Sequence, residues 1–393
     1  MKSNKNNLIT VILIFLNNFL GLPMILFNIY KKKESVFLIA LFMGILGYYF
    51  TPSNADYDIA RYYSMFSDKT LRENTFMYQK DIYAEILINF LIKYDLSKNL
   101  LGFSSAFISY YFLMKSLFIV MKQKNIENKK YFMFFSLFFI SIPIIEYTGI
   151  RFLPAVSLFV YSIILKNKKN KKIYIIFMIS SIFFHSSMVL LIFLFLINEI
   201  IEQKIDIKIY KLFFFISLFL GIILNADILG NIIKLINELG YIYLSPAYIT
   251  GKWGEGYLKR LKMLEGLYYY RQMVLLSLKK IVIVAYFLLI KKNNKKIDKY
   301  ICMLGILCMS ISLFQTPFER YFRVFFFLII IFNVSNKLLN KKYKENNIFY
   351  LIIFSYSILI LVFDVRDHYY SLFISYSNII KISLINMLYE VFS

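Results

Sequence analysis

The sequence contains few of the residue types that bind metals or form disulfides. There are two cysteines, Cys302 and Cys308, within one apolar run, and two histidines, His185 and His368, far apart in the chain. This pattern excludes a disulfide framework, and the histidines and scattered carboxylates have no recognisable metal-ligand spacing. We therefore expect no metal site and no cofactor.

Charged residues are also scarce. They make up 18% of the 393 residues, whereas 59% are hydrophobic, and the mean hydropathy is +0.62. Long apolar runs separated by short charged stretches are typical of a polytopic membrane protein. The net charge of +23 comes largely from brief lysine patches between those runs. Such patches are typical of topology signals and of contacts with anionic lipids. We therefore do not expect nucleic-acid binding.

The apolar runs predict an all-α fold of about twelve transmembrane helices. The expected spans are residues 8–30, 35–50, 100–121, 131–147, 151–165, 173–185, 186–200, 211–226, 272–290, 299–315, 321–338 and 348–363. When these spans alternate, every lysine-rich connector lies on one side, which is then the cytoplasmic side. Because the chain has no internal repeat, residues 1–393 are expected to form a single integral membrane domain.

The outer side carries the longer polar segments. These are the outer-face loops at about 51–99, 227–271 and 364–378. Within the first loop, the stretch that contains Glu85 is too polar to cross the membrane. The spacing of its apolar residues predicts an amphipathic outer helix or a re-entrant segment. Function is expected on this side of the membrane.

All the arginines fall on the outer side. They are Arg61, Arg72, Arg151, Arg260, Arg271, Arg320, Arg323 and Arg366. The positive-inside rule treats lysine and arginine alike, so this sorting needs a second cause. A guanidinium can bind phosphate through two parallel hydrogen bonds, whereas an ammonium acts as a point charge. The distribution of arginine therefore indicates an outward-facing anion site.

Several outer-side residues recur at the expected starts of inward-running helices. They are Arg151, His185, Arg271, Arg320 and Arg323. An arginine there opposes the positive end of the helix dipole, which favours a compensating anion such as phosphate. Arg320 and Arg323 would share a helix face, where they could clasp a diphosphate or pair with Glu319. The alternative is that these arginines anchor helices at the lipid headgroups.

The first outer loop combines acids, phenols and an arginine. On a helix Tyr57 and Arg61 would share a face, and Asp58 would lie near Arg61 and Tyr62. Carboxylates beside aromatic rings suit carbohydrate, and the alternative is a solvated loop with an interfacial tyrosine belt. His185, at an apolar helix junction, is a candidate proton acceptor, or a histidine hydrogen-bonded within the bundle.

These motifs resemble those of a known family in order and membrane placement. They are Asp56-Tyr57 with Arg61-Tyr62-Tyr63, then Gly149-Ile150-Arg151, then Phe184-His185-Ser186-Ser187, with Glu319-Arg320-Tyr321 further on. Together they resemble the EpsG family of Wzy-type polysaccharide polymerases. The family commonly has glutamine after the Gly-Ile-Arg arginine, where this chain has Phe152.

The resemblance implies an enzyme of the bacterial cytoplasmic (inner) membrane whose active site faces the periplasm or cell exterior. It would join undecaprenyl-diphosphate-linked oligosaccharide repeat units into O-antigen, capsular or exopolysaccharide, without a metal. Its expected partners are those lipid-linked glycans, membrane lipids, a flippase and a chain-length regulator.

The expected roles follow from the departing lipid diphosphate, an anion that needs charge stabilisation. Arg151, Arg271, Arg320 and Arg323 would hold the diphosphate. His185 is the first candidate for the base that deprotonates the acceptor hydroxyl, with Asp56 or Glu85 as the second. Arg61, Tyr57 and Glu319 complete the expected substrate site.

Two other functions remain open. An O-antigen ligase would use the same donor and a different acceptor. A lipid-linked oligosaccharide flippase or other transporter should place charged residues near mid-membrane. Lys115 is taken as the main charge inside an expected span, and the arginines lie at outer ends, which disfavours transport.

Overall fold

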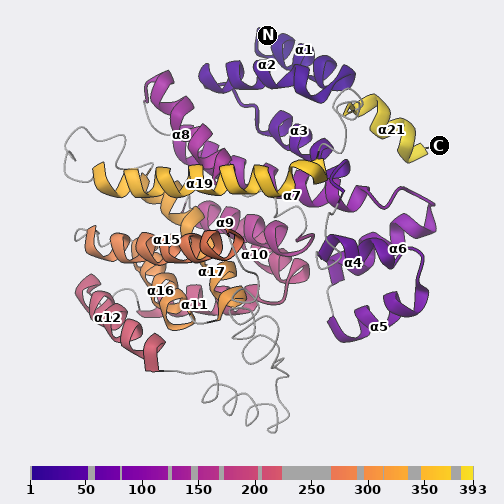
Figure 1. The fold of residues 1–393 in the computed structure, drawn as a ribbon. Coiled ribbons are helices and arrows are strands. Elements are labelled where there is room, and N and C mark those ends of the chain that lie inside the picture. The colour runs from indigo at the N-terminus through magenta and orange to yellow at the C-terminus, as the bar shows by residue number, and fades with distance from the viewer. Residues whose placement is uncertain are drawn as a thin grey trace. The chain divides into compact units, whose positions relative to one another are not determined.

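The computed structural model describes residues 2–51, 58–79, 82–122, 126–142, 149–167, 172–201, 206–223, 267–289, 296–312, 314–334, 347–372 and 382–392. Every regular element in these ranges is a helix (Figure 1). The contacts group the chain into two compact units, and the single integral membrane domain expected for residues 1–393 stays a prediction. Residues 1–190 and 357–393 form the first unit, and residues 191–356 form the second.

The first unit contains both termini and the helices of the N-terminal half. Its helices are α1 (Lys2–Leu16), α2 (Asn18–Tyr30), α3 (Val36–Tyr48), α4 (Asp58–Ser64), α5 (Lys69–Gln79), α6 (Ile82–Lys93), α7 (Leu100–Lys122), α8 (Asn128–Ile140), α9 (Phe152–Asn167), α10 (Ile173–Phe184) and α21 (Leu384–Phe392), with the start of α11 (Met188–Ile201) and the end of α19 (Asn347–Leu372). The expected amphipathic helix of the outer segment corresponds to α6. Helix α21, near the C-terminus, contacts α1 and α3.

The second unit holds the remaining helices. They are most of α11, then α12 (Ile207–Ile223), α15 (Leu267–Leu289), α16 (Lys296–Ser310), α17 (Gln315–Leu328), the π-helix η3 (Ile329–Val334) and the first part of α19. Stacked rings join α12 to α15, since the centroids of Phe214 and Phe287 lie 3.9 Å apart. On α16, the buried Tyr300 hydroxyl donates to the carbonyl of Leu191, 3.1 Å away.

Helix α7 is the one helix among the described residues that is both long and apolar enough to cross a membrane. Several shorter apolar helices accompany it, including α2, α3, α9, α10 and most of α11. This all-helical, apolar architecture fits a membrane protein. The number of spans and the sidedness of the loops stay predictions.

Glycines bring α3 and α7 into close contact. A methyl group on Gly47 would collide with the backbone carbonyl of Gly102, and one on Gly102 would collide with that of Gly47. Small residues let helix backbones approach in this way, which is common where helices associate in membranes. The crossing fixes the start of α7, to which the α4–α6 lobe attaches.

The structure differs from several expected boundaries. Helix α19 continues to Leu372, so it includes the first part of the outer-face loop expected at 364–378. Residues 8–30, expected as one span, are divided into α1 and α2, which pack against each other. Asn17 causes the break, because its side chain accepts from the N–H of Phe19 (2.9 Å) and caps α2. Residues 316–320, which separate the expected spans 299–315 and 321–338, instead belong to α17, which starts at Gln315.

Candidate functional site

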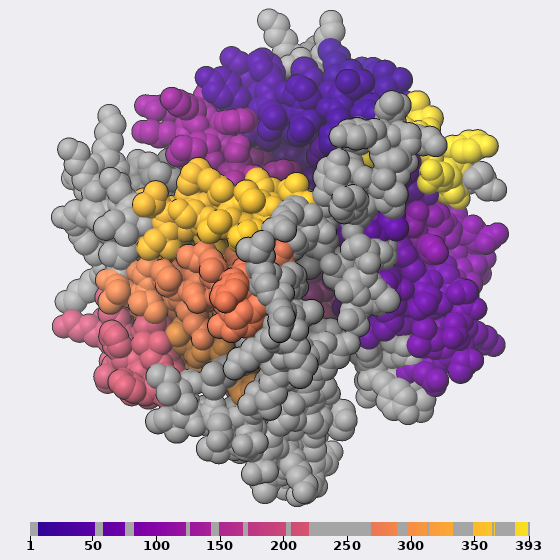
Figure 2. Space-filling model, viewed as in Figure 1, coloured from indigo at the N-terminus to yellow at the C-terminus, as the bar shows by residue number. Residues whose placement is uncertain are grey.

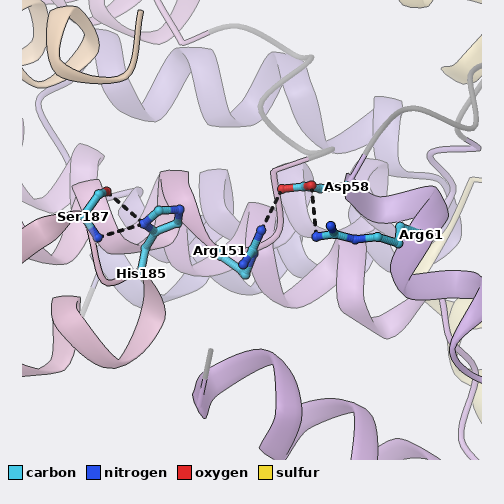
Figure 3. A network of polar contacts seen from close by, with 5 residues as sticks. All are labelled: Asp58, Arg61, Arg151, His185 and Ser187. Carbon is cyan, nitrogen blue, oxygen red and sulfur yellow. Dashed lines mark hydrogen bonds and ion pairs between the residues drawn. The ribbon is translucent and has the colours of Figure 1, made fainter. Parts of the chain in front are cut away.

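Asp58 forms ion pairs with two arginines of the first unit (Figure 3). Its Oδ1 accepts from Arg61 at 3.3 Å, and its Oδ2 accepts from Arg151 at 3.3 Å. Asp58 is the first residue of α4, where a carboxylate also interacts favourably with the helix dipole. The expected proximity of Asp58 and Arg61 is therefore confirmed, and Arg151 joins them from a distant part of the chain.

Tyr62 lies beneath both guanidinium groups. The central carbons of Arg61 and Arg151 are 5.3 and 5.4 Å from its ring centroid, within the range of cation–π attraction. Tyr62 is fully buried, and burial raises the pKa of its hydroxyl, which keeps it protonated. The neutral ring and the Asp58 carboxylate together let two like charges lie close to each other.

A hydrophobic cluster fixes this arrangement. It joins α4, α6 and the start of α7 to the segment before α9, and its buried members are Ile59, Tyr62, Met65, Ala84, Ile88, Leu91, Leu101 and Ile150. Ile59 and Tyr62 are three apart and so lie on one face of α4. Ile150 directly precedes Arg151, so the cluster sets the position of Arg151 relative to α4. The lobe formed by α4, α5 and α6 is visible in Figure 2 as a purple surface.

Arg151 begins α9, as the sequence predicts. Its carbonyl accepts the first helical hydrogen bond, from Ala155 (3.2 Å), and the residue is only 8% exposed. Asp58 supplies the compensating negative charge expected at this helix start. Asp58 therefore holds two guanidinium groups close together, and guanidinium is well suited to bind phosphate.

His185 lies at the junction of α10 and α11, close to Arg151 in the first unit. Its ring meets Phe152, the residue after Arg151, edge to face with centroids 5.4 Å apart. The Nδ1 atom accepts from the backbone N–H of Ser187 (3.1 Å) and is 2.8 Å from the Ser187 hydroxyl. The sequence therefore identified two residues, Arg151 and His185, at adjacent helix ends.

Helix α6 is attached beside His185. Tyr83 stacks on Phe184 with centroids 3.9 Å apart and donates to Ser104 Oγ at 3.0 Å. Burial raises the pKa of Tyr83 to about 12, and the Ser104 hydrogen bond partly offsets this. Glu85, a predicted site residue, follows Tyr83 by two positions, so it lies on nearly the opposite face of α6 from the ring that meets Phe184.

The other predicted arginines lie in the second unit. Arg320 and Arg323 are in one helix, α17, as expected, yet at its sixth and ninth positions and not at its start. Arg271 is the fifth residue of α15 and is 9% exposed. The interaction with the helix dipole falls off within the first turn, so that argument does not apply to Arg320 and Arg323.

Glu319 pairs with a lysine that the sequence interpretation overlooked. Lys279, in the middle of α15, donates to Glu319 Oε1 at 2.6 Å, and Gln315 donates to the same oxygen. The two charged side chains are 13% and 25% exposed, respectively. Lys115 is therefore not the main charge within an expected span, because Lys279 also lies inside the span expected at 272–290.

The predicted site residues thus divide into two groups. Arg61, Arg151 and His185 gather in the first unit with Asp58 and Tyr62, while Arg271, Glu319, Arg320 and Arg323 belong to the second. Asp56 and Tyr57 lie outside the described residues. That all the predicted arginines form one diphosphate clamp stays a prediction. Among the residues described, no three His, Cys, Asp or Glu side chains are grouped closely enough to hold a metal ion.

The fold and site define an apolar, all-helical protein that fits the membrane and carries an arginine cluster, Arg61 and Arg151 joined by Asp58. The comparison with protein families matches residues 53–378 to the EpsG family, a family of Wzy-type polysaccharide polymerases, and the chain belongs to that family. The matched range includes every residue of the arginine cluster. No curated protein and no solved structure gives a significant match to this chain.

Proposed function

We propose that this protein joins lipid-diphosphate-linked oligosaccharide repeat units into a polysaccharide at the outer face of the bacterial cytoplasmic membrane. Family membership gives the general activity of a polysaccharide polymerase. The undecaprenyl diphosphate carrier rests on what the resemblance to that family implies, and the outer-face location rests also on the sorting of lysine and arginine along the sequence.

In the proposed reaction, a hydroxyl oxygen of the incoming unit attacks the anomeric carbon of the growing glycan. A new glycosidic C–O bond forms, and the bond between that carbon and the diphosphate oxygen breaks. The electron pair of the broken bond leaves with the lipid diphosphate, and the hydroxyl proton passes to a base. Fixed positive charge near the departing oxygen lowers the barrier, since it acts where negative charge develops.

The arrangement of Asp58, Arg61 and Arg151 is the observation that carries the proposal. Both arginines are held by one carboxylate and one aromatic ring before any substrate binds, so little reorganisation is needed when the anion arrives. Arg151 is buried at the start of α9, where backbone N–H groups also favour an anion. Arg271, Arg320 and Arg323 are proposed as further contacts with the substrate.

The base is proposed to be a carboxylate. Asp58 is poorly suited, because both of its carboxylate oxygens already accept from guanidinium groups. Asp56 and Glu85 remain the carboxylate candidates.

A transporter of lipid-linked oligosaccharides is the second candidate, and the Lys279–Glu319 ion pair favours it. Paired charges within the apolar part of a membrane protein often mark a substrate or ion pathway. An enzyme and a transporter differ in their products, since only the enzyme makes a longer glycan.

The test uses purified protein with lipid-linked repeat units as the only substrate and a chelator present. We expect a ladder of glycans that increase by one repeat unit at a time. A second arm adds lipid A core, and transfer of single units to that acceptor without a ladder would identify a ligase. A third arm uses sealed vesicles, and translocation of intact units without elongation would identify a transporter.

A further inference from the structure

His185 caps the helix that follows it. Its backbone is extended, with φ −158° and ψ 121°, and its carbonyl accepts from the N–H of Met188 (3.1 Å) at the start of α11. The Nδ1 atom accepts from the N–H of Ser187. A side-chain acceptor that binds one of the first N–H groups of a helix is the usual N-cap arrangement, here made by an imidazole.

This contact determines where the proton of the neutral ring lies. A backbone N–H can only donate, so Nδ1 must present its lone pair to Ser187. In a neutral imidazole one nitrogen carries the proton and the other accepts, so the proton is on Nε2. The hydroxyl of Ser187, 2.8 Å from Nδ1, can turn its hydrogen toward the same lone pair.

The contact at Nδ1 and the start of α11 both disfavour a positive charge on this ring. A second proton on Nδ1 would point at the N–H of Ser187 and break the cap. An imidazolium would also lie at the positive end of the α11 dipole. Arg151, which is positively charged, lies immediately before the adjacent helix α9, and Phe152 of that helix contacts the His185 ring. A neutral ring with hydrogen on Nε2 is therefore the form that this site stabilises.

We propose that His185 serves the reaction as a hydrogen-bond donor and not as the base. In this proposal, which rests on the proposed function, the Nε2–H group binds an oxygen of the departing diphosphate beside Arg151. In Figure 3 the edge of the ring that carries Nε2 faces away from Ser187. A neutral donor held in place by a helix cap stabilises the charge that develops on the leaving oxygen without any transfer of its own proton.

Two amide variants separate the functions of the two ring nitrogens. In His185→Gln the amide nitrogen can reach the position of Nε2 and donate, but the cap at Nδ1 is lost. In His185→Asn the side-chain oxygen lies near the position of Nδ1 and is a preferred N-cap acceptor, but the distant donor is lost. Elongation of lipid-linked units and the thermal midpoint are measured for both variants in the same detergent.

We expect His185→Gln to retain elongation within about tenfold of the wild-type rate, and His185→Asn to stay folded but lose about 100-fold or more. Loss of elongation in both folded variants would overturn the proposal in favour of a base. Full elongation by His185→Asn would overturn it in favour of a cap alone. If wild-type protein makes no ladder, the proposed function fails, and that result is distinct from either of these.

A spectroscopic measurement tests the tautomer even if neither variant folds. The chain has only two histidines, so protein labelled with ¹⁵N-histidine gives signals from two rings, and the His368→Gln variant assigns them. We expect His185 to show a protonated Nε2 and an unprotonated Nδ1 at neutral pH. A proton on Nδ1, in either the other tautomer or the imidazolium, would contradict the proposal.

Discussion

The carboxylate of Asp58 joins Arg61, three positions further along α4, to Arg151, which is 93 positions away and begins α9. The short helix α4, between α3 and α7 in the chain, is thereby tied to the start of an apolar helix. Because both arginines share one carboxylate and one ring, a change in Asp58 or Tyr62 should affect both. Substitutions of Asp58 and Tyr62 therefore test separately the charged and the aromatic contacts of the two arginines.

Asp58→Asn should lower the maximal rate of elongation more than it weakens binding of the donor. The substitution removes the charge that orients both guanidiniums, so they lose their fixed geometry while the site becomes more positive. We expect the maximal rate to fall by about 10- to 100-fold, as misplaced catalytic groups do, with little change in the Michaelis constant for the lipid-linked donor.

Asp95→Asn is the matched control for that experiment. Asp95 follows α6 in the same outer segment, and asparagine accepts its positive φ of 51° as readily as aspartate does. It therefore removes the same charge without touching an arginine. Equal losses in the two variants would mean that overall charge, and not the position of Asp58, sets the rate.

Tyr62 should act through its ring. Tyr62→Phe keeps the aromatic face beneath Arg61 and Arg151, whereas Tyr62→Leu preserves an apolar side chain without that face. We expect elongation by Tyr62→Phe to stay close to wild type. Tyr62→Leu should lose about 1–2 kcal/mol of the interaction with the guanidiniums and be correspondingly slower. A strong defect in Tyr62→Phe would instead assign a role to the buried hydroxyl.

The Lys279–Glu319 pair should behave as a coupled unit in stability measurements. Glu319→Gln leaves Lys279 buried without its charged partner, which typically costs about 3–5 kcal/mol. Adding Lys279→Met should restore much of that loss, since two neutral side chains have no charge to compensate. Thermal midpoints of the two single variants and the double variant check this. Additive losses would show that the pair is not coupled.

The sequence predicted the structural features that depend on residues close together in the chain. The breaks before Phe152 and after Phe184 follow from short polar interruptions of apolar runs, and both were predicted. The pairing of Asp58 with Arg61 was also predictable, because residues three apart on a helix are neighbours. These features require only hydrophobic patterning and helical spacing.

Contacts between segments that are far apart in the chain could not be predicted from the sequence in the same way. Arg151 meets Asp58 because Ile150 and Ile59 enter one hydrophobic cluster, and a single sequence does not indicate which apolar faces will pack together. Lys279 was overlooked because its charge lies within a long apolar run, where it hardly changes the average hydropathy. Its partner, Glu319, is on a different helix.

The central claim is that the guanidinium of Arg151 stabilises the departing lipid diphosphate, and the rate of elongation by Arg151→Lys tests it most directly. Lysine keeps the positive charge but cannot form two parallel hydrogen bonds with phosphate or span Asp58 and the anion together. Arg72→Lys is the control, because Arg72 donates to the backbone of Met65 within the same outer lobe. We predict a loss of about 100-fold or more for Arg151→Lys in folded protein and near-normal elongation for Arg72→Lys. Full-length polysaccharide made at the wild-type rate by Arg151→Lys would contradict the claim.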